Sequence, residues 1–257
     1  GGPHEPWDAP GEYATMYDPA ETPPPIVPVE ARSWVPDGVA EWERSARRTD
    51  MSEDDVRRLR ANYYGKISLI DHWVGEIFAA CESKRIMDDL LVVFWSDHGE
   101  MAGDHQLLHK SRFFESALRV PLMLRWPGNI RAGRTSSALV ETVDIMPTVL
   151  EAVAGRLPPS CQGESLWPVL RRPSTKLREA VLSEVGHQGR RNMMIRTERC
   201  KYAVHEDGQP YMLYNLVRDP GEQTNLLGHP KAQEIERQMR ERLFRLAGKT
   251  GLKATGG

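Results

Sequence analysis

The residues best suited to chemistry follow the apolar run Leu90–Trp95. Asp97 and His98 come directly after this run, and His109 and Lys110 come soon afterwards. A carboxylate and an imidazole in adjacent positions suit a metal ion. A lysine ammonium neutralises the oxygens of an anion. This combination of residue types indicates chemistry on an anionic substrate.

Two apolar runs predict the strands that position these residues. Leu90–Trp95 is continuously apolar and rich in Val and aromatics, which is typical of a strand buried on both faces. Val120–Arg125 predicts a second central strand. Ligands of open α/β sheets bind beyond the carboxyl ends of the strands, so Asp97 and His98 lie where a site is expected. Such a sheet usually has about five or six strands, and we expect the others upstream of Gly1.

Helices are predicted from apolar periodicity and capping residues. Apolar residues recur every three or four positions over Glu53–Ser83, and Ser52 with Asp55 fits a capping box at the start. Followed by the first apolar run, this helix resembles part of a βαβ unit. A second helix is expected over Ile145–Ala154, where Gly155 suits the C-terminal cap.

From Val181 the pattern changes to short strands separated by turn residues, and an amphipathic helix closes the chain. The expected strands are Val181–Glu184, Asn192–Arg196, Cys200–His205 and Tyr211–Leu216, and the expected helix is Ala232–Ala247. We therefore predict an α/β fold with two parts. Residues 1–175 form part of a mixed sheet flanked by helices, and residues 176–257 form a small antiparallel sheet with a helix.

Composition excludes several classes of protein. The net charge of −2 arises from interspersed basic and acidic residues, so we expect neither a nucleic-acid surface nor a polybasic membrane patch. No apolar run approaches the ~18 residues of a transmembrane segment. Cys81, Cys161 and Cys200 are too few and too scattered for a disulfide framework or a zinc motif. No signal peptide is visible, and a periplasmic, secreted or cytoplasmic location stays open.

Three stretches resemble one protein family. Val93–His105 reads VFWSDHGEMAGDH and resembles the C-terminal signature of the type I sulfatases, which belong to the alkaline-phosphatase-like superfamily. Lys110–Gly128 resembles the stretch that follows this signature, and Tyr214–Leu226 resembles the C-terminal subdomain. The resemblance runs through nearly the whole chain. It implies an alkaline-phosphatase-like fold and the second half of such an enzyme.

The resemblance also implies roles for individual residues. Asp97 and His98 would hold calcium, with magnesium or another divalent ion as an alternative. Calcium prefers oxygen ligands, so His98 fits it less well than an asparagine would and is either a weak ligand or a contact to the sulfate. Lys110 would contact the substrate sulfate. His4, in the segment PHEP, resembles the family histidine that contacts sulfate and protonates the leaving oxygen, work that suits an imidazole. His109 would help to shape the leaving-group pocket.

Further acidic residues near the site are expected to have structural roles. Glu100 and Asp104 would hold the loop after the first strand by hydrogen bonds. Glu115 and Arg119 stand four positions apart, which favours an ion pair on a helix.

The family nucleophile is a formylglycine made from the Cys or Ser of a Cys/Ser-x-Pro-x-Arg motif. This chain has no such motif, so we expect the nucleophile upstream and expect the isolated chain to be inactive. The prediction is thus part of a calcium-dependent sulfatase acting on a sulfated small molecule or carbohydrate. The alternatives are a phosphonate or phosphate ester hydrolase of the same superfamily and a noncatalytic remnant that binds anions. We expect no nucleic-acid partner, and homo-oligomerisation stays open.

Overall fold

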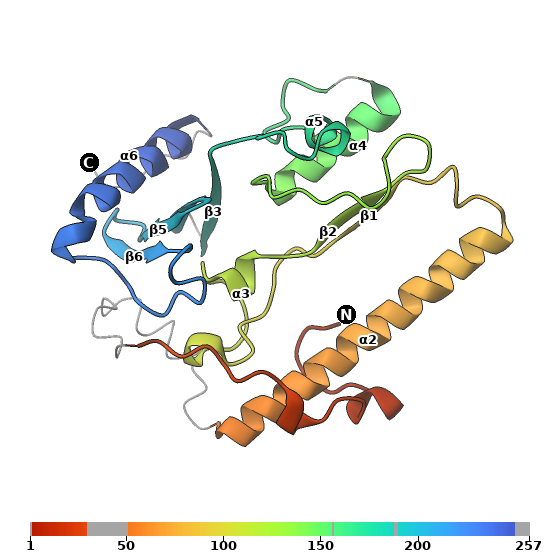
Figure 1. Cartoon of the computed structure of the whole chain (residues 1–257), viewed down its shortest axis with the longest axis horizontal. Coiled ribbons are helices and arrows are strands. Elements are labelled where there is room, and N and C mark those ends of the chain that lie inside the picture. Colours follow the sequence, from red (N-terminus) through yellow and green to blue (C-terminus); the bar gives the residue numbers. More distant parts are fainter. Residues whose placement is uncertain (1, 30–50, 156, 188–189, 250–257) are drawn as a thin grey trace.

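Two antiparallel sheets organise the chain in the computed structural model, which describes residues 2–29, 51–155, 157–187 and 190–249 (Figure 1). The strands are β1 Val92–Trp95, β2 Leu122–Arg125, β3 Ala180–His187, β4 Arg190–Thr197, β5 Cys200–Val204 and β6 Pro210–Asn215. The α-helices are α2 Glu53–Ser83, α3 Glu115–Leu118, α4 Ile145–Ala154, α5 Trp167–Arg171 and α6 Gln233–Lys249. Short 3-10 helices lie at Gly11–Ala14, Pro19–Glu21, Asp104–Gln106, Thr142–Asp144 and Pro230–Ala232.

The long helix α2 has the predicted bounds and the predicted capping box. The Asp55 amide donates to Ser52 Oγ at 3.2 Å, and the Ser52 amide donates to Asp55 Oδ2 at 3.1 Å. Its first turns are buried, with Val56 fully enclosed, whereas Trp73 and Ile77 further along are each 59% exposed. Among the described residues, the apolar stripe of α2 is therefore covered only towards its start.

The strand β1 corrects one prediction. Leu90–Trp95 was expected to be buried on both faces, but the strand is Val92–Trp95 and Trp95 is 48% exposed. In the described part of the chain β1 pairs only with β2, antiparallel, and its other three residues are half-buried. No described strand precedes α2, so the βαβ unit stays a prediction.

The C-terminal sheet has two buried faces, which pack against different partners. Residues of β4, β5 and β6 alternate between them: Met194, Ala203 and Met212 face one side, and Ile195, Tyr202 and Leu213 face the other. The helix α6 covers the second face (Figure 1). All four strands and the helix were predicted, with bounds that differ by a few residues.

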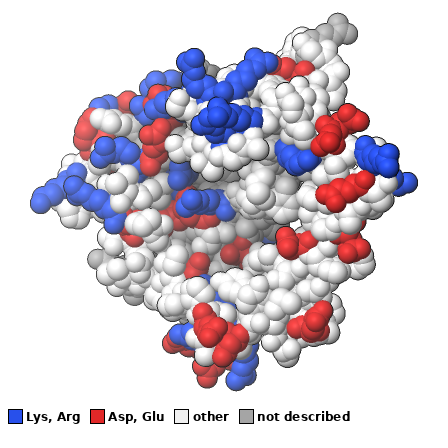
Figure 2. All heavy atoms as spheres, turned by 45° about the vertical axis from the view of Figure 1, so that its right-hand side comes forward, with Lys and Arg blue, Asp and Glu red and all other residues white. Residues whose placement is uncertain are grey.

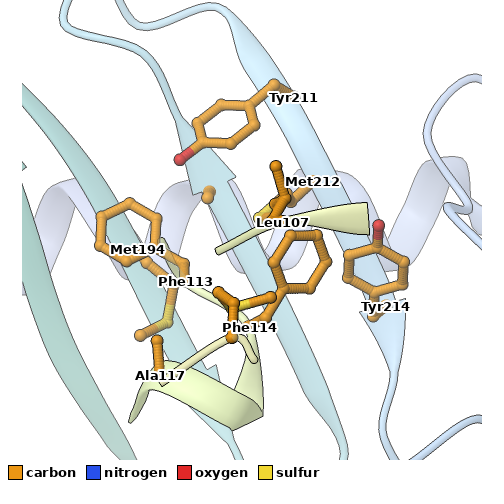
Figure 3. Packing of buried hydrophobic residues seen from close by; sticks show 10 residues of the cluster. Leu107, Phe113, Phe114, Ala117, Met194, Tyr211, Met212 and Tyr214 are labelled. Carbon is orange, nitrogen blue, oxygen red and sulfur yellow. The ribbon is translucent and has the colours of Figure 1, made fainter. Parts of the chain in front are cut away.

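The first face of this sheet packs against the segment around α3. Figure 3 shows Leu107, Phe113, Phe114 and Ala117 beside Met194, with Met212 and the tyrosines of β6 completing the cluster. The segment from residue 101 to 118 therefore shares one hydrophobic core with a sheet that lies much later in the sequence.

A buried ion cluster reinforces this junction. Lys201 Nζ lies 2.6 Å from Glu222 Oε1 and 2.8 Å from Glu115 Oε1, and Arg196 Nε donates to Glu115 Oε1 at 3.0 Å. The predicted partner of Glu115, Arg119, is wrong. Because α3 ends before Arg119, whose backbone is extended, the pair lacks the helical geometry that the prediction assumed.

The helix α4 has the predicted bounds, and Gly155 ends it with a φ of +67°. Asp144 is fully buried and directly precedes α4. Arg178 Nη1 donates to Asp144 Oδ2 at 2.5 Å, and Arg178 Nη2 donates to Asp144 Oδ1 at 2.8 Å. This bidentate pair ties α4 to the segment that leads into β3. Of the described helices, none is both long and apolar enough to cross a bilayer.

Candidate functional site

The connection from β1 to β2 carries most of the predicted site residues. Because the two strands are antiparallel, with Trp95 opposite Leu122, the end of β1 and the start of β2 lie at one edge. The connection leaves this edge and returns to it. Several residues of the connection other than glycine have a positive φ: Ala102 at 43°, His105 at 53°, Gln106 at 59°, His109 at 65° and Ser111 at 69°. This backbone conformation costs roughly 1–2 kcal/mol per residue.

The strained connection is held by Arg60 of α2. Its guanidinium lies 2.6 Å from Asp104 Oδ1 and donates to the carbonyl of Ala102 at 2.8 Å. Asp104 also accepts from the Ile26 amide at 2.8 Å and from the Ser116 hydroxyl at 2.7 Å. The expectation that Asp104 holds this loop by hydrogen bonds is confirmed, as is that for Glu100, which accepts from the Ala102 amide at 3.3 Å.

Asp97 and His98 present two metal-binding groups side by side. His98 Nδ1 lies 2.8 Å from the carbonyl of Gly99, which only accepts, so Nδ1 is the donor and Nε2 is the nitrogen free to bind a metal in the neutral ring. His98 Nε2 is 3.7 Å from Asp97 Oδ2, and the Asp97 side chain is 83% exposed. A hydrogen bond from the second imidazole nitrogen to a carbonyl is the usual way to orient a histidine ligand. The pair therefore fits a divalent cation.

Gly99 fixes the direction in which the chain leaves this pair. Its amide donates to the carbonyl of Ala117 at 2.8 Å. A Cβ at this position would lie 2.0 Å from the carbonyl oxygen of Ser116. Only glycine allows this approach, which anchors Asp97 and His98 against α3.

Lys110 and His4 meet although 106 positions separate them in the sequence. Lys110 Nζ is in direct contact with His4 Nε2. The N-terminal segment is brought there by Lys66 of α2, which donates to the carbonyls of His4 and Pro6 at 2.9 Å and 2.6 Å. The two residues predicted to contact sulfate thus lie together, whereas their role in binding it stays a prediction.

Glu5 is a residue of this site that the sequence did not reveal. Its carboxylate lies 2.8 Å from His4 Nδ1, 3.3 Å from His109 Nδ1 and 3.6 Å from Lys110 Nζ. Trp7 stacks on the ring of His109, with 5.5 Å between the ring centroids. A glutamate beside His4 was visible in the segment PHEP, but nothing in the sequence placed it against residues more than a hundred positions away.

Two carboxylates in this region have opposite electrostatic surroundings. Burial opposes ionisation of Glu5, but its own backbone amide together with Lys110, His109 and His4 outweighs it and lowers the pKa of Glu5. Burial dominates at Glu100 and raises its pKa, with Glu5 adding to the rise and His109 opposing it.

Donor atoms of Glu5, Glu100 and His109 all lie within 4.8 Å of one another, so these three form a second group of metal-ligand types.

Asp97, His98 and Lys110 line a common open cavity of about 2100 Å³. Arginines contribute to its wall, among them Arg119 and Arg131, which are exposed. Figure 2 shows one face of the molecule, hollowed at its centre and bordered by mixed basic and acidic side chains. The predicted metal ligands and the predicted sulfate-binding lysine therefore face one space, large enough for a substrate and for further protein.

Comparison with known proteins identifies relatives along most of the chain. A family model described as Sulfatase matches residues 1–155, and one described as N-sulphoglucosamine sulphohydrolase, C-terminal, matches residues 103–249. The multifunctional alkaline phosphatase superfamily protein PehA of Trinickia caryophylli is 32% identical over 89% of the chain and 50% of its own length. Arylsulfatase K of Gallus gallus is 34% identical over 69% of the chain and 35% of its own length.

Solved structures agree with these relatives. The phosphonate monoester hydrolase of Agrobacterium radiobacter matches 96% of this chain and 55% of its own, with a TM-score of 0.87 and 28% identity. The structure of BT4656 in complex with its substrate D-glucosamine-2-N,6-O-disulfate matches 82% of this chain and 45% of its own, with a TM-score of 0.71 and 25% identity. The chain thus spans about half the length, or less, of the proteins it matches.

Proposed function

Because the chain belongs to the sulfatase family, we propose that it forms part of a hydrolase of sulfate esters whose nucleophile comes from outside residues 1–257. The contact between Lys110 and His4 carries this proposal. It brings a cation and an imidazole together at one point from distant parts of the sequence, beside a cavity that Asp97 and His98 also line. A cation and an imidazole in contact beside a cavity suit the binding of an anionic ester, whereas they contribute little to the packing of the fold.

Each residue has a distinct task in this proposal. Lys110 binds oxygens of the ester and offsets the charge that develops as the ester bond breaks. His4 lies beside it and gives a proton to the leaving oxygen. His109, fixed by Trp7, borders the side of the leaving group. An upstream formylglycine would supply the attacking oxygen.

Asp97 and His98 would hold a divalent cation, which supplies positive charge to the sulfate oxygens when bound. One carboxylate oxygen and one imidazole nitrogen are what this chain offers, so further ligands must come from the rest of the protein. Calcium is the ion that we propose. Magnesium or another divalent ion is the alternative; nitrogen is a poor ligand for calcium and magnesium alike, so the imidazole of His98 favours a softer divalent ion.

The substrate class that we propose is a sulfated small molecule or carbohydrate. Support comes from the sulfated glucosamine bound by the similar protein BT4656 and from the arylsulfatase among the relatives. The alcohol that carries the sulfate depends on parts of the site outside this chain.

A phosphonate or phosphate ester hydrolase is the second candidate. The likeness to a phosphonate monoester hydrolase, with its TM-score of 0.87, favours it, as does the relative PehA. Both candidates use the same groups of this chain. They differ in the charge of the substrate, since a phosphate monoester carries nearly two negative charges and a sulfate monoester carries one.

The proposal is tested on the full-length protein that contains this chain, with 4-nitrophenyl sulfate and 4-nitrophenyl phenylphosphonate as substrates. We expect turnover of the sulfate ester and a loss of about 100-fold or more in Lys110→Ala. Lys84→Ala is the matched control, because Lys84 is an exposed cap of α2. Preference for the phosphonate would favour the second candidate. Anion binding without turnover of either ester would favour a noncatalytic remnant.

A further inference from the structure

We propose that Glu5 is a positioning residue for His4: its carboxylate holds Nδ1 of the imidazole, so that Nε2 lies beside Lys110, where it would give its proton to the leaving oxygen. This inference rests on the proposed hydrolysis of an ester at Lys110 and His4. It assigns a role to a residue to which the family resemblance gave none. Glu5 touches neither substrate nor nucleophile in this scheme and acts through its neighbour.

The two nitrogens of His4 have different partners. Nδ1 lies 2.8 Å from Glu5 Oε2 and 3.2 Å from the Glu5 backbone carbonyl, both of which only accept hydrogen bonds. The proton of Nδ1 is therefore directed at Glu5. Nε2 points the other way, into contact with Lys110. A carboxylate that fixes one nitrogen of a catalytic histidine is a recurrent way to set its tautomer and its orientation.

Charge gives Glu5 a second task. A histidine that donates a proton carries a positive charge before it does so, and the ammonium of Lys110 beside it is a second positive charge. The Glu5 carboxylate is 2.8 Å from the imidazole and 3.6 Å from the ammonium, so it attracts both cations at once. It thereby offsets the positive charge that these two neighbouring side chains bring to one site.

Glu5 is itself held in place. His109 Nδ1 lies 3.3 Å from Glu5 Oε1, and Trp7 stacks on the other side of that imidazole. The carboxylate is thus bracketed by His109 on one oxygen and by His4 and Lys110 on the other. This explains why a partly exposed glutamate has a defined position.

The proton balance of the step is simple. As the nucleophile bonds to sulfur, the S–O bond to the alcohol breaks and its electron pair stays on the leaving oxygen. That oxygen takes the proton of His4 Nε2, and the alcohol leaves uncharged. His4 becomes neutral and keeps its Nδ1 proton on Glu5.

A metal ion between Glu5, Glu100 and His109 is the competing interpretation of the same residues. The ammonium of Lys110 already lies 3.6 Å from Glu5 and occupies the position of positive charge. A bound cation would have to displace it or share the carboxylate with it. We therefore favour the positioning role, and the experiment includes metal as one of its arms.

The experiment compares two sulfate esters in the full-length protein and in its Glu5→Gln variant. 4-Nitrophenolate leaves without protonation, whereas an alkoxide needs a proton. We expect kcat for an alkyl sulfate to fall about 30-fold or more, while kcat for 4-nitrophenyl sulfate changes less than about threefold. Glu5→Asp should restore part of the activity, and Glu12→Gln, at an exposed position of the same segment, should match the wild type.

Three outcomes are distinguishable. Equal losses for both esters would overturn the inference, because Glu5 would then serve structure or sulfate binding rather than proton donation. Zinc that binds to Asp97→Ala protein but not to Glu5→Gln protein by isothermal titration calorimetry would overturn it in favour of a metal site at Glu5, Glu100 and His109. Wild-type protein without turnover of any sulfate ester would refute the proposed function instead.

Discussion

Replacing Arg60 should release the connection that carries His109 and Lys110. The Arg60 side chain is 9% exposed, and its guanidinium meets Asp104 at 2.6 Å, the carbonyl of Ala102 at 2.8 Å and that of Pro23 at 2.9 Å. Hydrogen bonds of charged groups contribute about 1.5–3 kcal/mol each. Lysine keeps the charge but cannot reproduce the planar fork, so at least one such bond is lost without a substitute.

We therefore expect Arg60→Lys to lower the free energy of unfolding of the chain by about 2–3 kcal/mol. Arg60→Met should lower it by about 3–5 kcal/mol, since it leaves Asp104 without its cation. Urea unfolding followed by circular dichroism measures both values. Arg58→Lys, two positions away on α2, is the matched control. Arg58 is exposed and lies 3.8 Å from Asp55, and such an ion pair contributes at most about 1 kcal/mol.

The same variants test the link from clamp to site. Hydrogen exchange at the amides of residues 101–109 should accelerate in Arg60→Lys and stay unchanged in Arg58→Lys, because positive-φ residues relax when the clamp opens. In the full-length protein, kcat/KM should fall about 10- to 100-fold through misplacement of Lys110. If the free energy of unfolding of Arg60→Lys lies within about 0.5 kcal/mol of the wild-type value and hydrogen exchange is unchanged, the prediction is refuted. The connection would then keep its conformation without Arg60.

Four further outcomes are expected. Asp97→Asn should weaken binding of a divalent cation to the full-length protein about tenfold or more by isothermal titration calorimetry, since the amide lacks charge; unchanged affinity would place the ion elsewhere. Lys201→Met should cost about 3–5 kcal/mol near neutral pH by leaving Glu222 buried without a cation, and Lys201→Met/Glu222→Gln should recover most of it. Because burial raises the folded-state pKa of Glu222, the cost should grow as pH rises through that value and shrink in mild acid, which thermal melts at two pH values will show. The chain 1–257 alone should bind a hydrophobic dye strongly through exposed Trp73, Ile77 and Met123, whereas weak dye binding would mean that this surface is covered by self-association. The same isolated chain should not turn over sulfate esters. Measurable turnover by residues 1–257 alone that Asp97→Ala abolishes would refute that expectation.

Local signals explain what the sequence predicted well. The bounds of α2 follow from a capping box and from apolar residues every three or four positions, and those of α4 from Gly155 at its end. Both signals act within a few residues of the element they define. The C-terminal strands were equally accessible, since turns separate them and each pairs with the next in sequence.

Long-range contacts explain what the sequence could not supply. The burial of β1 depends on neighbours outside the strand. Among the described residues, these neighbours leave Trp95 about half exposed. Glu115 was assigned the wrong partner because the length of α3 is set by its packing against the later sheet, not by its own four residues. Glu5 was missed because spacing says nothing about which distant loop a segment will contact.

The core shared by residues 101–118 and the C-terminal sheet imposes an order on biosynthesis. Lys110 leaves the ribosome 105 residues before Asn215, the last residue of β6 (215 − 110 = 105). At about 5–20 residues per second, its loop waits roughly 5–20 seconds for the sheet against which Phe113 and Phe114 pack. Asp97, His98 and Lys110 are thus translated early, but the loop that carries Lys110 is fixed in place only after β6 has formed. A nascent chain released before β6 would carry every site residue described above and still lack the surface that holds them, which makes this interval the natural time for chaperones to act.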